Sequence, residues 1–202
     1  MTLKLTIYSD YMCPWCYVGQ GVVERLKTEY PVEVDWQPFY LRPDTPPEGM
    51  DLPAYILEKV ATTTNRLKNT ASAYGMDFVH VQRLFNTRRA HEATEYARQQ
   101  GKAEAFHRAV FNKVYGLGQD ISTWEVLRAA AVETSLDADE MQSKVESGEY
   151  TKLVESQIAQ AHALGITGVP MYVLNNRYGI VGSQPYEVFK QAIARLEAEK
   201  KA

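Results

Sequence analysis

Hydrophobic and polar residues alternate in two stretches near the N-terminus, at residues 3–8 and 32–36. A period of two predicts a β-strand in each stretch. Between them, apolar residues recur every four positions over residues 18–26, which predicts a helix. The apolar positions are Leu3, Leu5 and Ile7, then Val18, Val22 and Leu26, then Val32, Val34 and Trp36. Residues 1–40 therefore predict a βαβ unit, with parallel strands joined by a right-handed crossover.

A proline-rich loop, residues 41–53, interrupts this pattern, and helical signals then dominate as far as Gly165. We expect a helix from Asn86 or Thr87 to Gly101 and another over 102–115. Further helices are expected after Ser122, from Asp137 to about Gly148, and over 149–164. The middle of the chain is therefore predicted to be helical.

Strand patterns return at residues 171–174 and 178–181, and Asn175-Asn176 between them predicts a hairpin. A last helix should follow Pro185. The order is βαβ, a helical block, then ββα, which predicts an α/β fold. The simplest assembly is one four-stranded sheet built from residues 1–45 and 166–202, with residues 46–165 inserted as a helical domain.

Composition narrows the function classes. The chain of 202 residues is 45% hydrophobic and 23% charged, with a net charge of −3, so it is typical of a globular protein. It has no excess of basic residues, which argues against a nucleic-acid partner. No apolar run approaches the roughly 18 residues of a membrane span, and the N-terminus lacks the apolar core of a secretory signal. We therefore expect a cytoplasmic protein that binds neither nucleic acid nor membrane.

The two cysteines, Cys13 and Cys16, flank Pro14 and Trp15 at the predicted strand-to-helix junction. Such a pair can be a redox centre, half of a metal site, or two inert buried thiols. The first N–H groups of a helix lack partners and favour negative charge. We therefore expect Cys13 to be the exposed, more readily ionised thiol and Cys16 to be its buried partner. A metal site would need two more soft ligands. The chain has no other cysteine, and His80, His91, His107 and His162 show no spacing that completes such a site.

Other residues have both a functional and a structural interpretation. Trp15 could contact substrate or be a surface aromatic in the turn. Asp10 is close enough to influence the cysteines electrostatically, but it could equally be a turn residue. His91 could face the active site or be a structural helix residue. Four aromatic residues could line an apolar groove or belong to the core: Tyr11, Phe39, Tyr40 and Tyr172.

Several segments together resemble the DsbA-like thioredoxin superfamily, and within it the FrnE-like branch of cytosolic oxidoreductases. They are Asp10–Gly19, which contains the Cys-Pro-Trp-Cys motif, Pro38–Pro43, Asn86–His91, Gly165–Pro170 and Gly182–Pro185. The resemblance covers nearly the whole chain and implies a thioredoxin-like fold with an all-helical insertion. It also implies a cis Val169–Pro170 bond that faces the cysteines, with the Val169 backbone pairing with substrate.

The same superfamily contains kappa-class glutathione transferases and 2-hydroxychromene-2-carboxylate isomerases. Those proteins place a serine where this chain has Cys13 and an Asp-Arg or Ser-Asp pair after the late glycine. Here both cysteines are present and Gly182 is followed by Ser-Gln-Pro, which favours thiol–disulfide exchange.

The resemblance thus predicts a thiol–disulfide oxidoreductase in which Cys13 attacks and Cys16 resolves. Pro14, Trp15, Val169 and Pro170 would contact the substrate. No tightly bound cofactor or metal is expected. The partners would be protein or small-molecule thiols and disulfides, with glutathione or a thioredoxin-type reductant recycling the pair. The alternatives are a glutathione-dependent transferase or isomerase of small electrophiles and a non-catalytic redox sensor.

Overall fold

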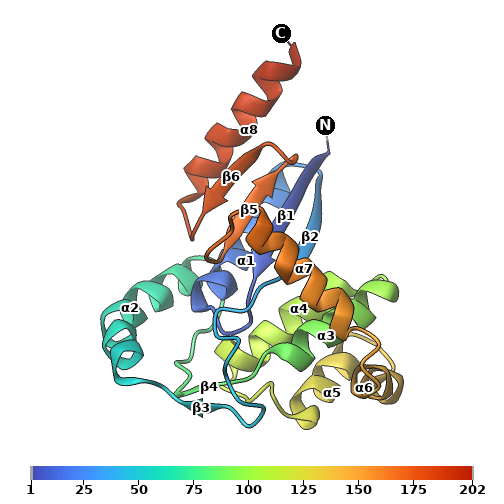
Figure 1. The fold of residues 1–202 in the computed structure, drawn as a ribbon. Coiled ribbons are helices and arrows are strands. Elements are labelled where there is room, and N and C mark those ends of the chain that lie inside the picture. The colour runs from blue at the N-terminus through green and yellow to red at the C-terminus, as the bar shows by residue number, and fades with distance from the viewer. Residues whose placement is uncertain (1, 202) are drawn as a thin grey trace.

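The computed structural model describes residues 2–201, and a four-stranded sheet lies in its upper half (Figure 1). The strands are β1 (Leu3–Ser9), β2 (Val32–Pro38), β5 (Met171–Leu174) and β6 (Tyr178–Val181). Their order is β2-β1-β5-β6; β1 and β2 are parallel, and the other neighbouring pairs are antiparallel. Asn175 and Asn176 form the β5–β6 turn with positive φ angles of 49° and 55°. The prediction of one sheet built from both ends of the chain is confirmed.

The two faces of the sheet are covered by different helices. Leu3, Leu5 and Ile7 point to one face and pack with α1 (Pro14–Glu29) and α8 (Tyr186–Lys201). Tyr8, one position out of phase, packs on the other side with Ala161 of the helix α7 (Thr151–Ala163). This alternation is the period of two that the sequence displays.

The helical insertion lies below the sheet in Figure 1. Besides α7, its helices are α2 (Ala54–Ala73), α3 (Arg88–Gln99), α4 (Ala103–Phe111), α5 (Trp124–Glu133) and α6 (Ala138–Glu146). The predicted helix over 102–115 is α4 together with a π-helical turn, η1 (Asn112–Gly116). A short ladder, which the sequence does not signal, pairs β3 (Met50–Asp51) with β4 (Arg83–Leu84).

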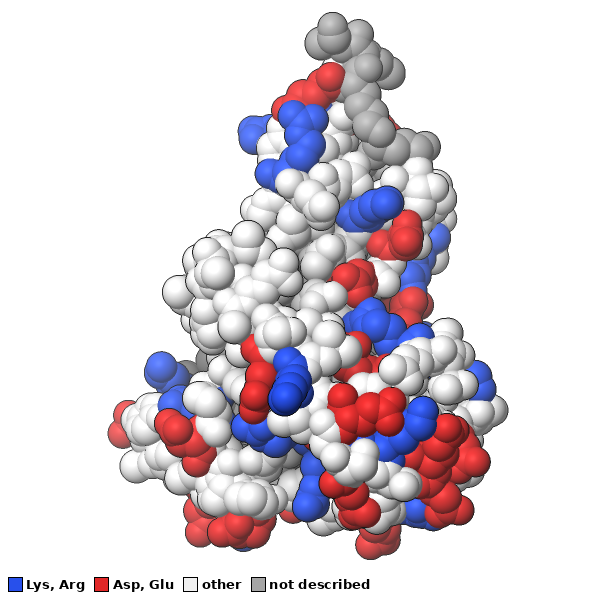
Figure 2. All heavy atoms as spheres, turned by 45° about the vertical axis from the view of Figure 1, so that its right-hand side comes forward, with Lys and Arg blue, Asp and Glu red and all other residues white. Residues whose placement is uncertain are grey.

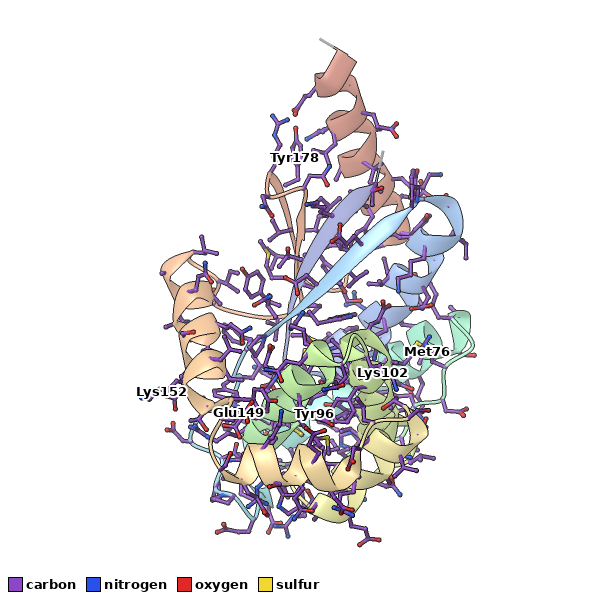
Figure 3. All side chains as sticks on the ribbon, turned by 90° about the vertical axis from the view of Figure 1, so that its right-hand side faces the viewer. Met76, Tyr96, Lys102, Glu149, Lys152 and Tyr178 are labelled. Carbon is purple, nitrogen blue, oxygen red and sulfur yellow. The ribbon has the colours of Figure 1, made fainter. Side chains whose placement is uncertain are left out.

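Polar side chains connect the elements of both halves. Arg98 of α3 donates to Asp35 of β2 at 2.7 Å and to the backbone oxygen of Trp36, which ties the insertion to the sheet. Tyr96, labelled in Figure 3, donates to Glu140 of α6 at 2.7 Å. At the opposite end of the molecule, Tyr178 of β6 reaches Glu199 of α8. The insertion is therefore held against the sheet along the side of β2.

Charges of both signs are interspersed over the lower part of the face shown in Figure 2. That face has no continuous basic stripe of the kind that binds nucleic acid. Within residues 2–201, no helix is both long and apolar enough to cross a membrane.

Candidate active site

The cysteine motif lies at the point where β1 ends and α1 begins. Cys13 is the N-cap residue of α1, and Pro14 occupies the first helical position. The backbone N–H of Cys13 donates to the backbone oxygen of Asp10 at 2.9 Å. The N–H of Cys16 lies 3.0 Å from the Cys13 oxygen and 3.3 Å from the Cys13 sulfur. The Cys13 sulfur is therefore the capping acceptor of the helix, where unpaired N–H groups favour negative charge.

A second segment, distant in sequence, meets the motif at this point. The Val169–Pro170 bond is cis, as the resemblance implied. The thiol of Cys13 donates to the backbone oxygen of Val169 at 3.4 Å. Pro170 is buried, and its oxygen accepts from the N–H of Gly182 at 2.8 Å. The fold thus brings together the motif and the Val169–Pro170 loop.

Both cysteines are free thiols and both are buried, Cys13 at 3% exposure and Cys16 at 1%. The prediction of an exposed Cys13 is wrong, because the motif packs into the apolar core of the insertion. Burial raises the pKa of the Cys16 thiol, and the hydrogen bond with Cys13 raises it further. The Asp10 backbone acts in the opposite direction. Cys16 is therefore a neutral thiol at pH 7.

A cavity of about 210 Å³ opens beside the motif, and Met12 and Pro14 form part of its wall. The rest of the wall comes from Leu41, Arg42 and Leu52, from α2, from residues 78–84 and from Tyr115 of η1. The Tyr115 hydroxyl is buried and has no hydrogen-bond partner within the described part of the chain. Burial raises the pKa of Tyr115, and the charges of the two cysteines and Asp10 act in the same direction. A neutral phenol thus lies close to the motif.

Asp10 lies under the turn that leads into the motif, at 1% exposure. Its carboxylate accepts from the N–H of Met12 at 3.2 Å and from the N–H of Leu41 at 2.7 Å. The ring of His91 lies next to Asp10, with its Nε2 atom 3.6 Å from the Asp10 carboxylate. Asp10 is therefore a turn residue that also brings a carboxylate close to the cysteines. His91 contacts the underside of the site and is itself buried.

A second, much smaller cavity lies next to His91. Its volume is about 10 Å³, and its wall includes Ser9, Trp36, His91 and His107. Each of these four residues has a buried side-chain nitrogen or oxygen without a hydrogen-bond partner among residues 2–201. Burial lowers the pKa of His107 well below its usual value, and nearby His91 and Arg98 lower it further. The cavity has the size and polar lining that a single buried water requires.

The remaining candidates from the sequence are Trp15 and the four aromatic residues considered for an apolar groove. Trp15 is half-buried against the core of the insertion, with the Arg66 guanidinium 4.9 Å from its ring centroid. The four aromatic residues considered for an apolar groove do not line the 210 Å³ cavity. Of these, Tyr11, Phe39 and Tyr172 are buried in the core, and Tyr40 makes an edge contact with His91. The groove interpretation is wrong for this set.

Two features of the site were not predicted from the sequence: the cavity wall formed by α2, and Tyr115. The glycines at 116 and 118 mark the end of a helix but give no indication of where the tyrosine points. Within residues 2–201, no group of three His, Cys, Asp or Glu side chains is arranged to hold a metal ion.

Comparisons with known proteins place the chain among relatives of the same fold. The chain is 29% identical to the uncharacterized protein YwbO of Bacillus subtilis (strain 168), covering 99% of this chain and all of that protein. It is 26% identical to a 2-hydroxychromene-2-carboxylate isomerase of Sphingobium xenophagum, covering 88% of this chain and 91% of the isomerase.

Among solved structures, a probable DsbA oxidoreductase from Streptomyces coelicolor superposes with a TM-score of 0.89 at 29% identity. The match covers 98% of this chain and 91% of that one. The model of one family, described as the DSBA-like thioredoxin domain, matches residues 4–194. The fold is thus that of DsbA-like thiol–disulfide oxidoreductases, and the chain belongs to the DSBA-like thioredoxin domain family.

Proposed function

We propose that the protein is a thiol–disulfide oxidoreductase of the FrnE-like branch, acting in the cytoplasm through Cys13 and Cys16. One observation carries the proposal: the Cys13 sulfur lies 3.3 Å from the Cys16 N–H and 3.4 Å from the Val169 oxygen. A sulfur at this position accepts one N–H of the helix and faces a backbone segment that can pair with a substrate. The presence of two thiols within one helical turn supports a reversible disulfide between them.

The reaction consists of two exchange steps. The Cys13 thiolate attacks one sulfur of a substrate disulfide, forms a mixed disulfide and releases the first substrate thiolate. Cys16 then loses its proton and attacks the Cys13 sulfur. This step closes the Cys13–Cys16 disulfide and releases the second thiolate. The protein gives up two electrons, the substrate takes them up, and glutathione or a thioredoxin-type reductant restores the dithiol.

The residues around the pair have distinct roles in this proposal. Val169 and Pro170 present the backbone edge against which the substrate lies. Pro14 starts the helix under the attacking sulfur, and Trp15 shields the pair. Because burial raises the pKa of Cys16, the resolver stays protonated until its attack. Cys13 is therefore the thiol that reacts with the substrate first, and Cys16 attacks afterwards.

A trapping experiment tests the proposal. Reduced Cys16→Ala should form a stable mixed disulfide on Cys13 with a substrate disulfide, visible by mass spectrometry and reversed by dithiothreitol. Cys13→Ala is the matched control and should form none. Titration of the wild type against glutathione buffers then gives the direction of electron flow. A potential near about −270 mV indicates a reductant, and one near about −120 mV indicates an oxidant.

A glutathione-dependent isomerase or transferase is the second candidate, favoured by the 26% identity to the 2-hydroxychromene-2-carboxylate isomerase. That activity would not need a resolving cysteine. If Cys16→Ala traps no adduct while a glutathione-dependent activity survives in Cys13→Ser, the second candidate replaces the first.

A further inference from the structure

The 210 Å³ cavity beside the motif is a candidate substrate pocket because the two neighbours of Cys13 form part of its wall. Met12 and Pro14, the neighbours of Cys13 on either side, both line it. Its opposite wall is α2, through residues such as Ile56 and Thr63. A molecule in this cavity would lie against the motif itself.

The size and the lining of the cavity indicate how large and how apolar its ligand should be. An apolar cavity of about 150 Å³ is large enough to bind benzene. At about 210 Å³, this cavity can hold one aromatic ring with a small substituent. Most of its wall is aliphatic or aromatic, including Val60, Leu67, Phe78 and Leu84. Apolar walls favour an apolar ring over a peptide backbone, whose polar groups would lose their hydrogen bonds there.

The positively charged residues around the cavity indicate which substituent the ligand should carry. Arg42 and Lys59 line it, and both are exposed to solvent. Within residues 2–201, neither of them pairs with a carboxylate. Two cations without acidic partners beside an apolar pocket match an anionic group on the ligand. The unpaired Tyr115 hydroxyl, buried in the same wall, adds one hydrogen-bonding group.

The accessibility of Cys13 suggests the size of the substrate. Cys13 is only 3% exposed, which leaves little of the residue open to a disulfide held in a folded protein surface. A small disulfide held in the cavity would lie against the residues on both sides of Cys13, which form part of the cavity wall.

We propose that this cavity, lined by Met12, Pro14, Thr63 and Tyr115, binds small aromatic disulfides and thiols that carry a carboxylate. The inference rests on the proposed function and specifies its substrate class. Cys13 attacks the substrate disulfide, one aryl thiolate leaves, and Cys16 closes the protein disulfide as it releases the second. The two electrons come from the dithiol, which a thiol reductant regenerates.

A pocket-filling substitution tests the proposal with three probes of different chemistry. 5,5′-Dithiobis(2-nitrobenzoate) is aromatic and anionic, 4,4′-dithiodipyridine is aromatic and uncharged, and hydroxyethyl disulfide is small and aliphatic. Thr63→Trp should slow the anionic aromatic probe by roughly tenfold or more, because the indole fills the space of one buried ring. Hydroxyethyl disulfide should react within about twofold of its wild-type rate, because it does not need the ring site.

Thr62→Trp is the matched control. Thr62 is the preceding residue of the same helix, its hydroxyl also bonds to the helix backbone, and its side chain is exposed away from the cavity. All three probe rates should stay at the wild-type level in this variant. Circular dichroism and thermal unfolding identify any variant that does not fold.

A second variant tests the charge without filling the cavity. Lys59→Glu should slow the anionic probe by about fivefold at low salt, the effect of one exposed charge pair. The uncharged dithiodipyridine should be unaffected. If Thr63→Trp and Lys59→Glu both leave the anionic probe at its wild-type rate, the pocket assignment is wrong.

The outcomes separate this proposal from the proposed function. If hydroxyethyl disulfide closes the Cys13–Cys16 bond but no probe prefers the pocket, the oxidoreductase stands and the substrate class fails. If no probe closes that bond, the oxidoreductase itself fails. If Thr63→Trp slows reduction of insulin as strongly as reduction of the aromatic probe, the pocket holds a protein side chain and the small-molecule proposal is overturned.

Discussion

The sheet and the helical insertion differ in what they bury. The core between the sheet, α1 and α8 is built from apolar side chains such as Leu5, Val22 and Phe189. The buried polar and charged side chains lie elsewhere: Ser9, Asp10, Gln20, Thr45, Thr87, His91, Glu92, Thr94, Glu95, His107 and Ser122. None of them belongs to the described part of the chain after residue 165. Because burying polar groups is costly, their concentration at the motif and the insertion is consistent with the proposed active site lying there.

Helix α1 belongs to both halves. Its N-terminal residues, which include Cys16 and Val18, pack into the core of the insertion. Its later turns, with Val22 and Leu26, pack against the sheet. The sheet therefore fixes the direction of the helix, while the insertion determines what surrounds the two thiols.

The largest effect is expected from removing a large ring from each core. Phe189→Ala in the sheet half and Phe106→Ala in the insertion should each lower the free energy of unfolding by about 3–5 kcal/mol, since both side chains are fully buried. Urea unfolding followed by circular dichroism measures this loss. Val181→Ala, at an exposed position, is the control and should change little. If either phenylalanine variant keeps its wild-type midpoint, the core it belongs to is not the one described.

Two glycines on α1 test the two contacts of that helix separately. A Cβ at Gly19 would lie 2.1 Å from the Tyr172 hydroxyl oxygen in the sheet core, and one at Gly21 would lie 2.2 Å from the Tyr74 ring at the end of α2. Tyr172 is fully buried, so Gly19→Ala should lower the free energy of unfolding by about 1–3 kcal/mol.

Tyr74 is only half-buried, so Gly21→Ala should displace α2 and cost less in global stability. Hydrogen exchange should then be faster in α2 and unchanged in β5. Unchanged exchange in α2 would show that Tyr74 does not hold that helix against α1.

His107, a residue of α4 in the helical insertion, should make the free energy of unfolding depend on pH. Burial holds its pKa well below the usual 6.5, so the unfolded chain takes up the proton first as the pH falls. The stability contributed by neutral His107 is therefore complete above pH 6.5 and declines below it, by up to about 1.4 kcal/mol per pH unit. His107→Phe keeps a ring on Trp36 without a titrating group.

Urea unfolding of both proteins between about pH 7.5 and 5 measures the difference in slope. Other groups titrate in both proteins, so the difference in slope belongs to position 107. Parallel slopes would mean that His107 is protonated equally in the folded and unfolded chains.

The sequence predicts the sheet half more completely than the insertion. Strand alternation and the Asn175-Asn176 turn depend on neighbouring residues, so the pattern itself predicts β1, β2 and the β5–β6 hairpin. The cis bond at Pro170 could be predicted only from the family resemblance. In the insertion, α2 includes Thr62-Thr63-Thr64, whose β-branched side chains have low helix propensity, and its bounds could not be assigned.

The site itself depends on contacts between residues distant in sequence, which no local pattern encodes. The motif predicts two thiols at a helix start, and the structure has them there. It does not predict that Cys13 packs into the apolar core of the insertion, and for that reason the expected exposure was wrong. Likewise, the Asp10–His91 contact joins the turn after β1 to α3, and neither segment alone indicates the other.

The smallest effect is expected where the insertion touches the motif, at Trp15. The Arg66 guanidinium of α2 lies 4.9 Å from the centroid of the Trp15 ring, a cation–π geometry. At a half-exposed site such a contact is worth about 0.5–1 kcal/mol. A double-mutant cycle with Arg66→Ala and Trp15→Ala, measured by urea unfolding, should give a coupling energy in that range. Arg66→Lys should keep part of it, because the positive charge remains. A coupling energy of zero would mean that the cation–π contact with Arg66 does not help to hold Trp15 in place.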